Sequence, residues 1–248
     1  MSAPNVDVVL VIDASSSMRP CIDQLRMHLR ELVKPMQGYV GRVRFGLVAL
    51  GASSKDEGSV TYKVRTLAGE WDLKANLYTQ GGRQLEYFTD NPDAIIRAMD
   101  EVVVSGDEDN LLALDIALDH PFGPTSTTKR VIAMFADEIL ENGVERRAGL
   151  AKLPELIDKI HRRRVKLFCA LPYSDAAQRL SEANGSELEA VEGREGLMAL
   201  DFGALLGQMG KSISVSALQG ALVEEPTAAL FGQDKWVSSD DLWSGSDT

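Results

Sequence analysis

Hydrophobic residues follow two different spacings along this chain, and segments with one spacing alternate with segments that have the other. Residues 8–12 and 131–136 are unbroken apolar runs, and 165–171 is nearly so. Such runs are typical of strands that are buried on both faces of a parallel sheet. Residues 22–33 and 150–160 instead carry apolar side chains three and four positions apart, which predicts amphipathic helices. Strands that alternate with helices in this way indicate a doubly wound sheet with helices on both faces.

One predicted strand has the period of an exposed edge. In residues 59–67, apolar side chains alternate with polar ones, as expected of a strand that faces water on one side. This strand follows a largely apolar one at 43–50, and no element is predicted over 71–82. The fold class that we expect is therefore α/β, with a mostly parallel sheet, one antiparallel edge strand and helices on both faces.

The pattern changes after Ser214. The segment 215–248 has no sustained helical period, is rich in acidic residues and ends in Ser-Gly-Ser-Asp-Thr, a composition that does not favour a packed core. It nevertheless contains Trp236 and Trp243, whose large apolar surfaces are costly to leave in water. We predict a domain over 1–214 and a separate acidic tail over 215–248. The tail either folds back on the domain or docks onto another protein, and the sequence leaves both alternatives open.

Charge and composition exclude several classes of function. The chain has 248 residues, with 37 acidic against 26 basic side chains and a formal net charge of −11, which argues against non-specific nucleic-acid binding. No apolar run approaches the roughly 20 residues of a membrane span, and the first residues lack the pattern of a secretory leader. Cys21 and Cys169 lie far apart in the sequence, so no disulfide is predicted. We expect a cytoplasmic protein with no membrane or nucleic-acid partner.

The first apolar run ends at a set of oxygen-bearing side chains. Asp13, Ser15 and Ser17 follow 8–12, at the carboxyl end of a predicted central strand, where open α/β sheets bind ligands. One carboxylate and two hydroxyls on alternate residues can point at a common hard cation such as Mg²⁺. The serines could equally cap the helix that follows, and the residues alone leave both interpretations open. A second apolar run, 131–136, also ends in an acid, Asp137.

The stretch Asp13-Ala14-Ser15-Ser16-Ser17 resembles the metal-ion-dependent adhesion site of von Willebrand factor type A domains. The resemblance implies two further loops. The second commonly supplies a threonine, but many bacterial members have Gly-Asp-Glu there, and Gly106 is followed by Asp107 and Glu108 in this chain. Either acid would bind the ion directly or through water, although both are equally explained as the acidic start of a helix. The third loop supplies an aspartate at the end of a main strand, a position that Asp137 occupies.

The resemblance implies a binding module and not an enzyme. The implied metal ligands are Asp13, Ser15, Ser17, Asp107, Glu108 and Asp137. They would hold Mg²⁺ or Mn²⁺, and an Asp or Glu from a partner protein would complete the shell of the ion. Cytoplasmic bacterial members commonly act beside AAA+ ATPases, or with kinase and phosphatase partners in stress or defence systems, so the resemblance implies an adaptor role. The alternative is a metal-dependent phosphohydrolase that uses Asp13 and Asp137, although the second aspartate of phosphotransferase loops is replaced here by Ser15.

Overall fold

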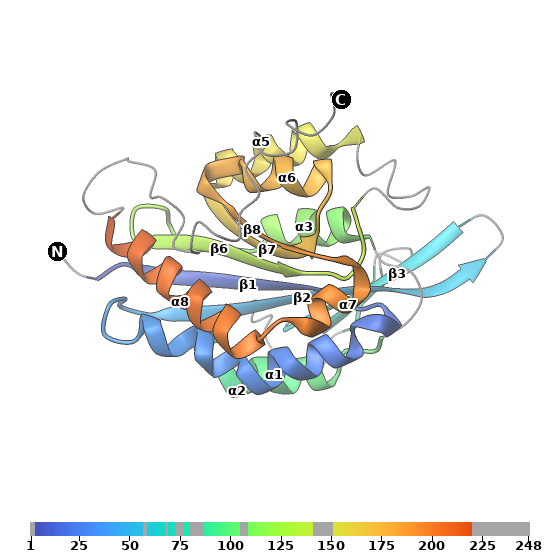
Figure 1. The fold of residues 1–248 in the computed structure, drawn as a ribbon, viewed down its shortest axis with the longest axis horizontal. Helices are drawn as coiled ribbons and strands as arrows, with labels where there is room; N and C mark the ends of the chain where they lie inside the picture. The colour runs from blue at the N-terminus through green and yellow to red at the C-terminus, as the bar shows by residue number, and fades with distance from the viewer. Residues whose placement is uncertain are drawn as a thin grey trace, which may run out of the picture.

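The computed structural model describes residues 3–56, 59–67, 69–72, 77–79, 87–104, 109–140 and 151–219. Within these residues, one eight-stranded sheet has the strand order β5-β4-β3-β2-β1-β6-β7-β8 (Figure 1). The strands are β1 (Asn5–Asp13), β2 (Val43–Asp56), β3 (Ser59–Thr66), β4 (Gly69–Asp72), β5 (Leu77–Thr79), β6 (Thr128–Phe135), β7 (Val165–Pro172) and β8 (Glu187–Val191).

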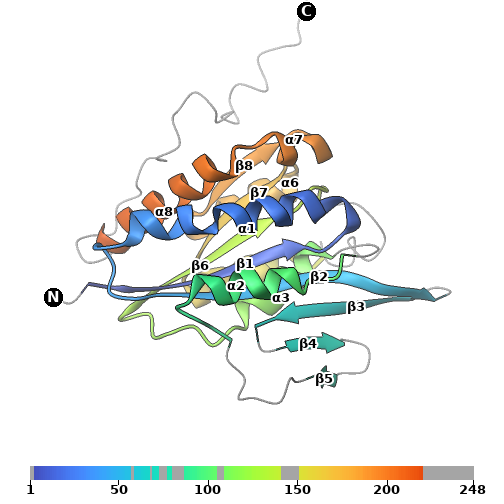
Figure 2. The ribbon, with the colours of Figure 1, turned by 90° about the horizontal axis from the view of Figure 1, so that it is seen from below.

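The sheet has a parallel part and an antiparallel part. Strand β1 pairs in parallel with β2 and β6, and the parallel pairing continues through β7 to β8. Strand β3 is antiparallel to β2, so the predicted fold class and its antiparallel strand are confirmed, but β3 lies between β2 and β4 and is not the edge of the sheet. Two short strands, β4 and β5, continue the antiparallel part beyond β3 (Figure 2). The sequence pattern did not predict them because strands of three or four residues are too short to show a period.

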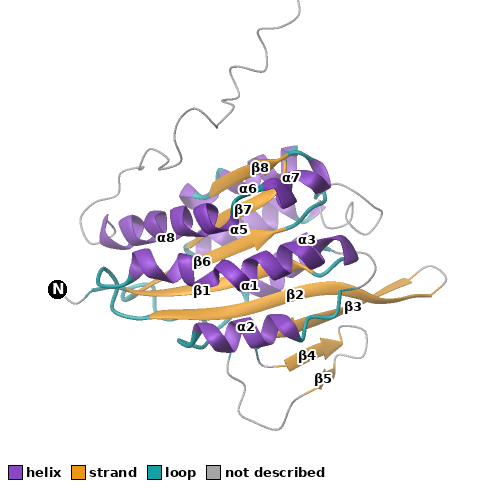
Figure 3. Ribbon diagram, turned by 60° about the horizontal axis from the view of Figure 1, so that its bottom comes forward, coloured by secondary structure: helices purple, strands orange, loops and turns teal. Residues whose placement is uncertain are grey.

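Helices cover both faces of the sheet (Figure 3). The first face carries α1 (Arg19–Val33), α2 (Pro92–Asp100), α7 (Gly193–Ala199) and α8 (Phe202–Gln219). The second face carries α3 (Asn110–Leu118), α5 (Leu153–Arg163) and α6 (Asp175–Ser181). Short 3₁₀ turns are η1 (Ser16–Met18), η2 (Lys34–Met36) and η3 (Ala183–Gly185).

The central strand β1 explains why the apolar runs are unbroken. Val8 and Leu10 are fully buried in the core beneath α1 and α8, whereas Val9 and Val11 are fully buried in the core beneath α3 and α5. Because successive side chains of a strand point to opposite faces, both faces must be apolar when helices cover both. The end of the sheet at which the parallel strands β1, β6 and β7 finish is called the carboxyl pole below. The end at which they begin is called the amino pole.

The last helix is longer than the sequence pattern indicated. Helix α8 continues to Gln219, and Ala217 is fully buried. The predicted boundary after Ser214 therefore falls inside α8. The Ser214 hydroxyl donates a hydrogen bond to the Pro35 carbonyl at 3.0 Å. Residues 220–248, the rest of the predicted tail, lie outside the described residues. Among the helices that the structure describes, none combines the length and apolar character that crossing a membrane requires.

Candidate metal site

The strand β1 ends at the carboxyl pole in a tight turn that gathers three oxygen-bearing side chains. Asp13 is 1% exposed, and its Oδ1 accepts a hydrogen bond from the Ser15 backbone N–H at 2.7 Å. The Ser15 and Ser17 hydroxyl oxygens lie 3.0 Å apart. Neither Ser15 before η1 nor Met18 before α1 makes a side-chain capping hydrogen bond. The arrangement therefore favours clustered oxygen atoms over the helix-cap interpretation for Ser15.

Asp137 follows the neighbouring strand, β6. It lies two residues after Phe135, which pairs in register with Ile12 at the end of β1, and it is 3% exposed. Burial raises the pKa of the Asp13 carboxyl from 3.8 to about 7. Hydrogen bonds from Ser15 oppose this rise, and the negative charge of Asp137 adds to it. The structure thus brings Asp13, Ser15, Ser17 and Asp137 together at the carboxyl pole, and their role as metal ligands stays a prediction.

Both carboxylates have an oxygen atom without a partner among the described residues. Asp13 Oδ2 and Asp137 Oδ1 are buried, and no described residue forms a hydrogen bond with either atom. Among the described residues, no Lys, Arg or His forms an ion pair with either aspartate. Buried charges are normally paired or bound to metal. A hard divalent cation that accepts carboxylate and hydroxyl oxygens fits this donor set.

The donor set is small. Within the described residues, no group of three or more His, Cys, Asp or Glu side chains could hold a metal ion. A site built on Asp13 and Asp137 therefore depends on hydroxyls and water for its other ligands. Such a site leaves positions open on the ion, as is usual for Mg²⁺, which keeps several waters.

The structure describes only the end of the second predicted loop, from Asp109 onward. Asp107 and Glu108 lie outside the described residues, so their ligand role stays a prediction. The next residue, Asp109, caps α3 by accepting a hydrogen bond from the Leu112 N–H at 2.9 Å. Asn110 follows it, is 4% exposed, and favours the charged form of Asp13 through its side-chain amide. Sequence reasoning missed Asn110, although a polar residue at the start of an apolar helix was a usable signal.

A thiol lies beneath the site. Cys21 in the first turn of α1 is buried, and its Sγ donates to Met198 Sδ in α7 at 3.3 Å. Burial raises the pKa of the Cys21 thiol to about 11, and the negative charges of Asp137 and Asp13 add to the effect. A thiol held neutral in this way packs as a small apolar group. Cys21 and Cys169 are both unpaired, as expected.

Solved structures show the same arrangement of strands and helices. A von Willebrand factor type A protein from Catenulispora acidiphila matches with a TM-score of 0.51 and 17% identity, over 85% of this chain and 43% of that chain. The fold is von Willebrand factor type A-like. Proximal thread matrix protein 1 from the mussel byssus matches with a TM-score of 0.50 and 12% identity, over 86% of this chain and 46% of that one.

At such low identity the type A-like likeness establishes the fold alone. This chain spans less than half the length of either matched chain. No protein-family model and no curated protein sequence matches it. The carboxyl pole, with its unpaired buried carboxylates, is therefore the candidate site on the grounds of its own geometry.

Proposed function

We propose that this chain is a metal-ion-dependent protein-interaction domain, with Mg²⁺ or Mn²⁺ bound at the carboxyl pole. One observation carries the proposal: two adjacent buried carboxylates, Asp13 and Asp137, each keep an unpartnered oxygen. A cation there would supply the positive charge that the surrounding residues lack. Ser15 and Ser17 would add hydroxyl oxygens, and Asp107 or Glu108 is proposed to add an acid from the second loop.

The bound ion would act as a Lewis acid toward one external oxygen ligand. The protein's part is to hold two carboxylates in fixed positions and to leave part of the coordination shell to water. An aspartate or glutamate of a partner protein can replace such a water, because carboxylate is a preferred ligand of both ions. The β1 turn keeps Asp13 oriented through the Ser15 N–H, so this ligand is in position before the partner arrives.

We propose binding and not catalysis for this site. The position two residues after Asp13, where phosphotransferase loops carry a second aspartate for proton transfer, is occupied by Ser15. The partner is proposed to be a cytoplasmic protein that presents an acidic side chain, with AAA+ ATPases and kinase or phosphatase systems as the classes that the family resemblance suggests. A phosphatase assay with Mg²⁺ on generic substrates tests the enzymatic alternative directly.

Calorimetric titration of the full chain with Mg²⁺ and Mn²⁺ tests the metal site. Wild type should give a weak isotherm, because few protein ligands hold the ion, and Asp13→Asn should abolish it. Asp175→Asn is the matched control, since Asp175 is an exposed acid that starts α6 and follows β7 at the same pole. The assignment is wrong if Asp13→Asn binds like wild type, or if wild type binds neither ion at millimolar concentration.

A further inference from the structure

A groove on the second face of the sheet has a charge opposite to that of the whole chain. It lies between α3 and α5 and has a volume of about 450 Å³. Its lining residues are Asp115, Lys152, Glu155, Leu156, Lys159, Arg162 and Arg163. Four of these side chains are cationic and two are anionic, whereas the chain carries a net charge of −11. The groove is therefore a cationic depression on an acidic protein.

Some of these cations are engaged within the domain. Lys159 Nζ lies 2.5 Å from Asp115 Oδ1 and 2.9 Å from Asp119 Oδ1. Arg163 donates from Nε to the Leu118 carbonyl at 2.8 Å. These contacts join α5 to α3 and account for two of the four positive charges.

The other two cations face solvent. Lys152 and Arg162 are exposed at opposite ends of α5, and in the part of the chain that the structure describes neither one has a carboxylate partner. Leu156 lies between them but is only 6% exposed, so what the groove offers a ligand is its exposed cations and their alkyl stems, which suit a segment that carries carboxylates.

The chain leaves its last described helix at the pole where α5 ends, on the opposite face of the sheet. Lys166 Nζ in β7 donates to Ser216 Oγ in α8 at 3.3 Å, which fixes the end of α8 beside the start of β7. Strand β7 begins two residues after Arg163, the last residue of α5. Residues 220–248 continue from this point. Helices α5 and α8 cover opposite faces of the sheet (Figure 1), and even a short extended segment, at about 3.3 Å per residue, can pass around the strand ends between them.

The residues that follow have the matching chemistry. Between 220 and 248 there is one basic side chain, Lys235, and the acids are Glu224, Glu225, Asp234, Asp240, Asp241 and Asp247. The same segment carries Trp236 and Trp243. Carboxylates form charge-assisted hydrogen bonds with Lys and Arg, and an indole ring stacks favourably on a guanidinium group.

We propose that residues 220–248 bind intramolecularly in the groove between α3 and α5. The acids flanking the tryptophans pair with Lys152 and Arg162, and an indole packs over the exposed Arg162 guanidinium. Because the segment is covalently tethered to the domain, its effective concentration is high and weak contacts are enough to keep it bound. This interaction is independent of the metal site.

Trypsin reports the bound state directly, because Lys235 is its single cleavage site between residues 220 and 248. In the full-length protein at low salt, release of the peptide 236–248 should be slow. The groove variant Lys152→Glu/Arg162→Glu should speed this release at least tenfold, and salt at 0.5 M should speed it in wild type through screening. The matched control Lys34→Glu/Lys211→Glu makes the same charge change in a depression between α1 and α8 and should leave the rate unchanged.

A second variant tests the proposal even if the groove variant misfolds. Asp240→Asn/Asp241→Asn leaves every described residue intact and should also speed release, with a matching rise in acrylamide quenching of tryptophan fluorescence. The proposal is overturned if wild type is cleaved at Lys235 as fast as the groove variant, or if the control variant speeds cleavage equally. Protection that weakens on dilution would also overturn it, since it would show binding between two copies of the chain.

Discussion

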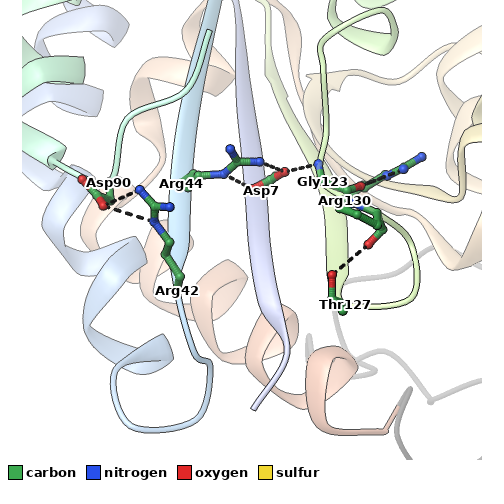
Figure 4. Close-up of polar contacts among 8 residues, drawn as sticks. Asp7, Arg42, Arg44, Asp90, Gly123, Thr127 and Arg130 are labelled. Atoms are coloured by element: carbon green, nitrogen blue, oxygen red, sulfur yellow. Dashed lines mark hydrogen bonds and ion pairs between the residues drawn. The ribbon is translucent and has the colours of Figure 1, made fainter. Parts of the chain in front are cut away.

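Asp7 and Asp13 lie at the two ends of β1, and each is at most 1% exposed. At the amino pole, Asp7 stands opposite Arg44 in the β1–β2 register. Arg44 donates from Nε to Asp7 Oδ1 at 2.8 Å and from Nη2 to Asp7 Oδ2 at 2.6 Å, and the Gly123 N–H donates to Oδ2 at 2.7 Å (Figure 4). At the carboxyl pole, Asp13 receives one backbone N–H and faces a second carboxylate, Asp137.

The amino pole is closed by a network that leaves no charge of Asp7 uncompensated. Hydrogen bonding to Asp7 is the largest cause of the raised pKa of Arg44. Arg130 donates to the Gly123 carbonyl from two nitrogens, at 2.7 and 3.0 Å, and to the Arg163 carbonyl at 2.9 Å. These bonds join β1, β2, β6 and α5 where the strands begin. A buried acid arranged in this way stabilises the fold.

The comparison shows that burial alone does not reveal what an aspartate does. Asp7 and Asp13 share a strand and a degree of burial, but among the described residues only Asp7 has a counter-charge. The deficit at Asp13 costs folding free energy in the absence of an external cation. Such a cost persists at sites where binding requires it, which is why the carboxyl pole and not the amino pole is the candidate site.

Removing the Asp7 carboxylate should have the largest effect on stability. In Asp7→Ala, the partly buried Arg44 and the Gly123 N–H lose their partner, and loss of one member of a buried ion pair costs about 3 kcal/mol or more. Urea denaturation measures this change. The control is Asp90→Asn, which breaks the exposed Arg42–Asp90 pair and should leave the midpoint unchanged. Equal, small effects of both variants would show that the Asp7 network is not structurally important.

The Asp13→Asn variant should behave in the opposite way. In the metal-free protein the uncharged amide removes the burial penalty and the repulsion from Asp137, while its oxygen can still accept the Ser15 N–H. We expect a gain of about 1–3 kcal/mol, or several degrees in melting temperature for a chain of this size. Thermal melts in the presence of a chelator measure it. A melting temperature below that of wild type would contradict the view that Asp13 is uncompensated.

The gain from Asp13→Asn should depend on pH. Because the folded-state pKa of Asp13 is about 7 against an ordinary 3.8, folding takes up a proton between these values, and metal-free wild type gains stability relative to the variant as pH falls. The difference in melting temperature should therefore shrink from pH 7.5 to pH 5. Burial lowers the pKa of His120 and destabilises both proteins in acid, so the comparison between them cancels this contribution. A constant difference across pH would contradict the raised pKa.

Adding Mg²⁺ should narrow the difference in stability between wild type and Asp13→Asn. An ion that binds only the folded state stabilises it by about 1.4 kcal/mol at roughly ten times its Kd. Wild type should therefore gain a few degrees in melting temperature with Mg²⁺, and Asp13→Asn should gain none. The same shift in both proteins would place the ion elsewhere.

The second loop should have the smallest effect. The double variant Asp107→Ala/Glu108→Ala should weaken metal binding by about 1 kcal/mol or more, as for loss of a charged ligand, whereas Glu108→Thr should keep binding or change the ion preference. Calorimetry measures both. Unchanged affinity in the double alanine variant would show that these acids do not reach the ion and leave Asp13, Ser15, Ser17 and Asp137 as the ligand set.

Local pattern was enough to predict the fold class and part of the site. The unbroken runs in β1 and β6, together with the acids that end them, placed Asp13 and Asp137 at strand ends, and parallel strands bring such ends to one edge. The strands and their terminal acids can be recognised from consecutive residues, because a strand buried on both faces has an unbroken apolar run.

Contacts between distant residues were decided only by the tertiary structure. The sequence offered no sign that Asp7 would meet Arg44 and Gly123, which are 37 and 116 positions away. Nor did it show that α8 would continue past Ser214, since a helix rich in small residues has a weak period and is held by its neighbours. The counter-charge that distinguishes Asp7 from Asp13 comes from another strand, so it exists only once the sheet has formed.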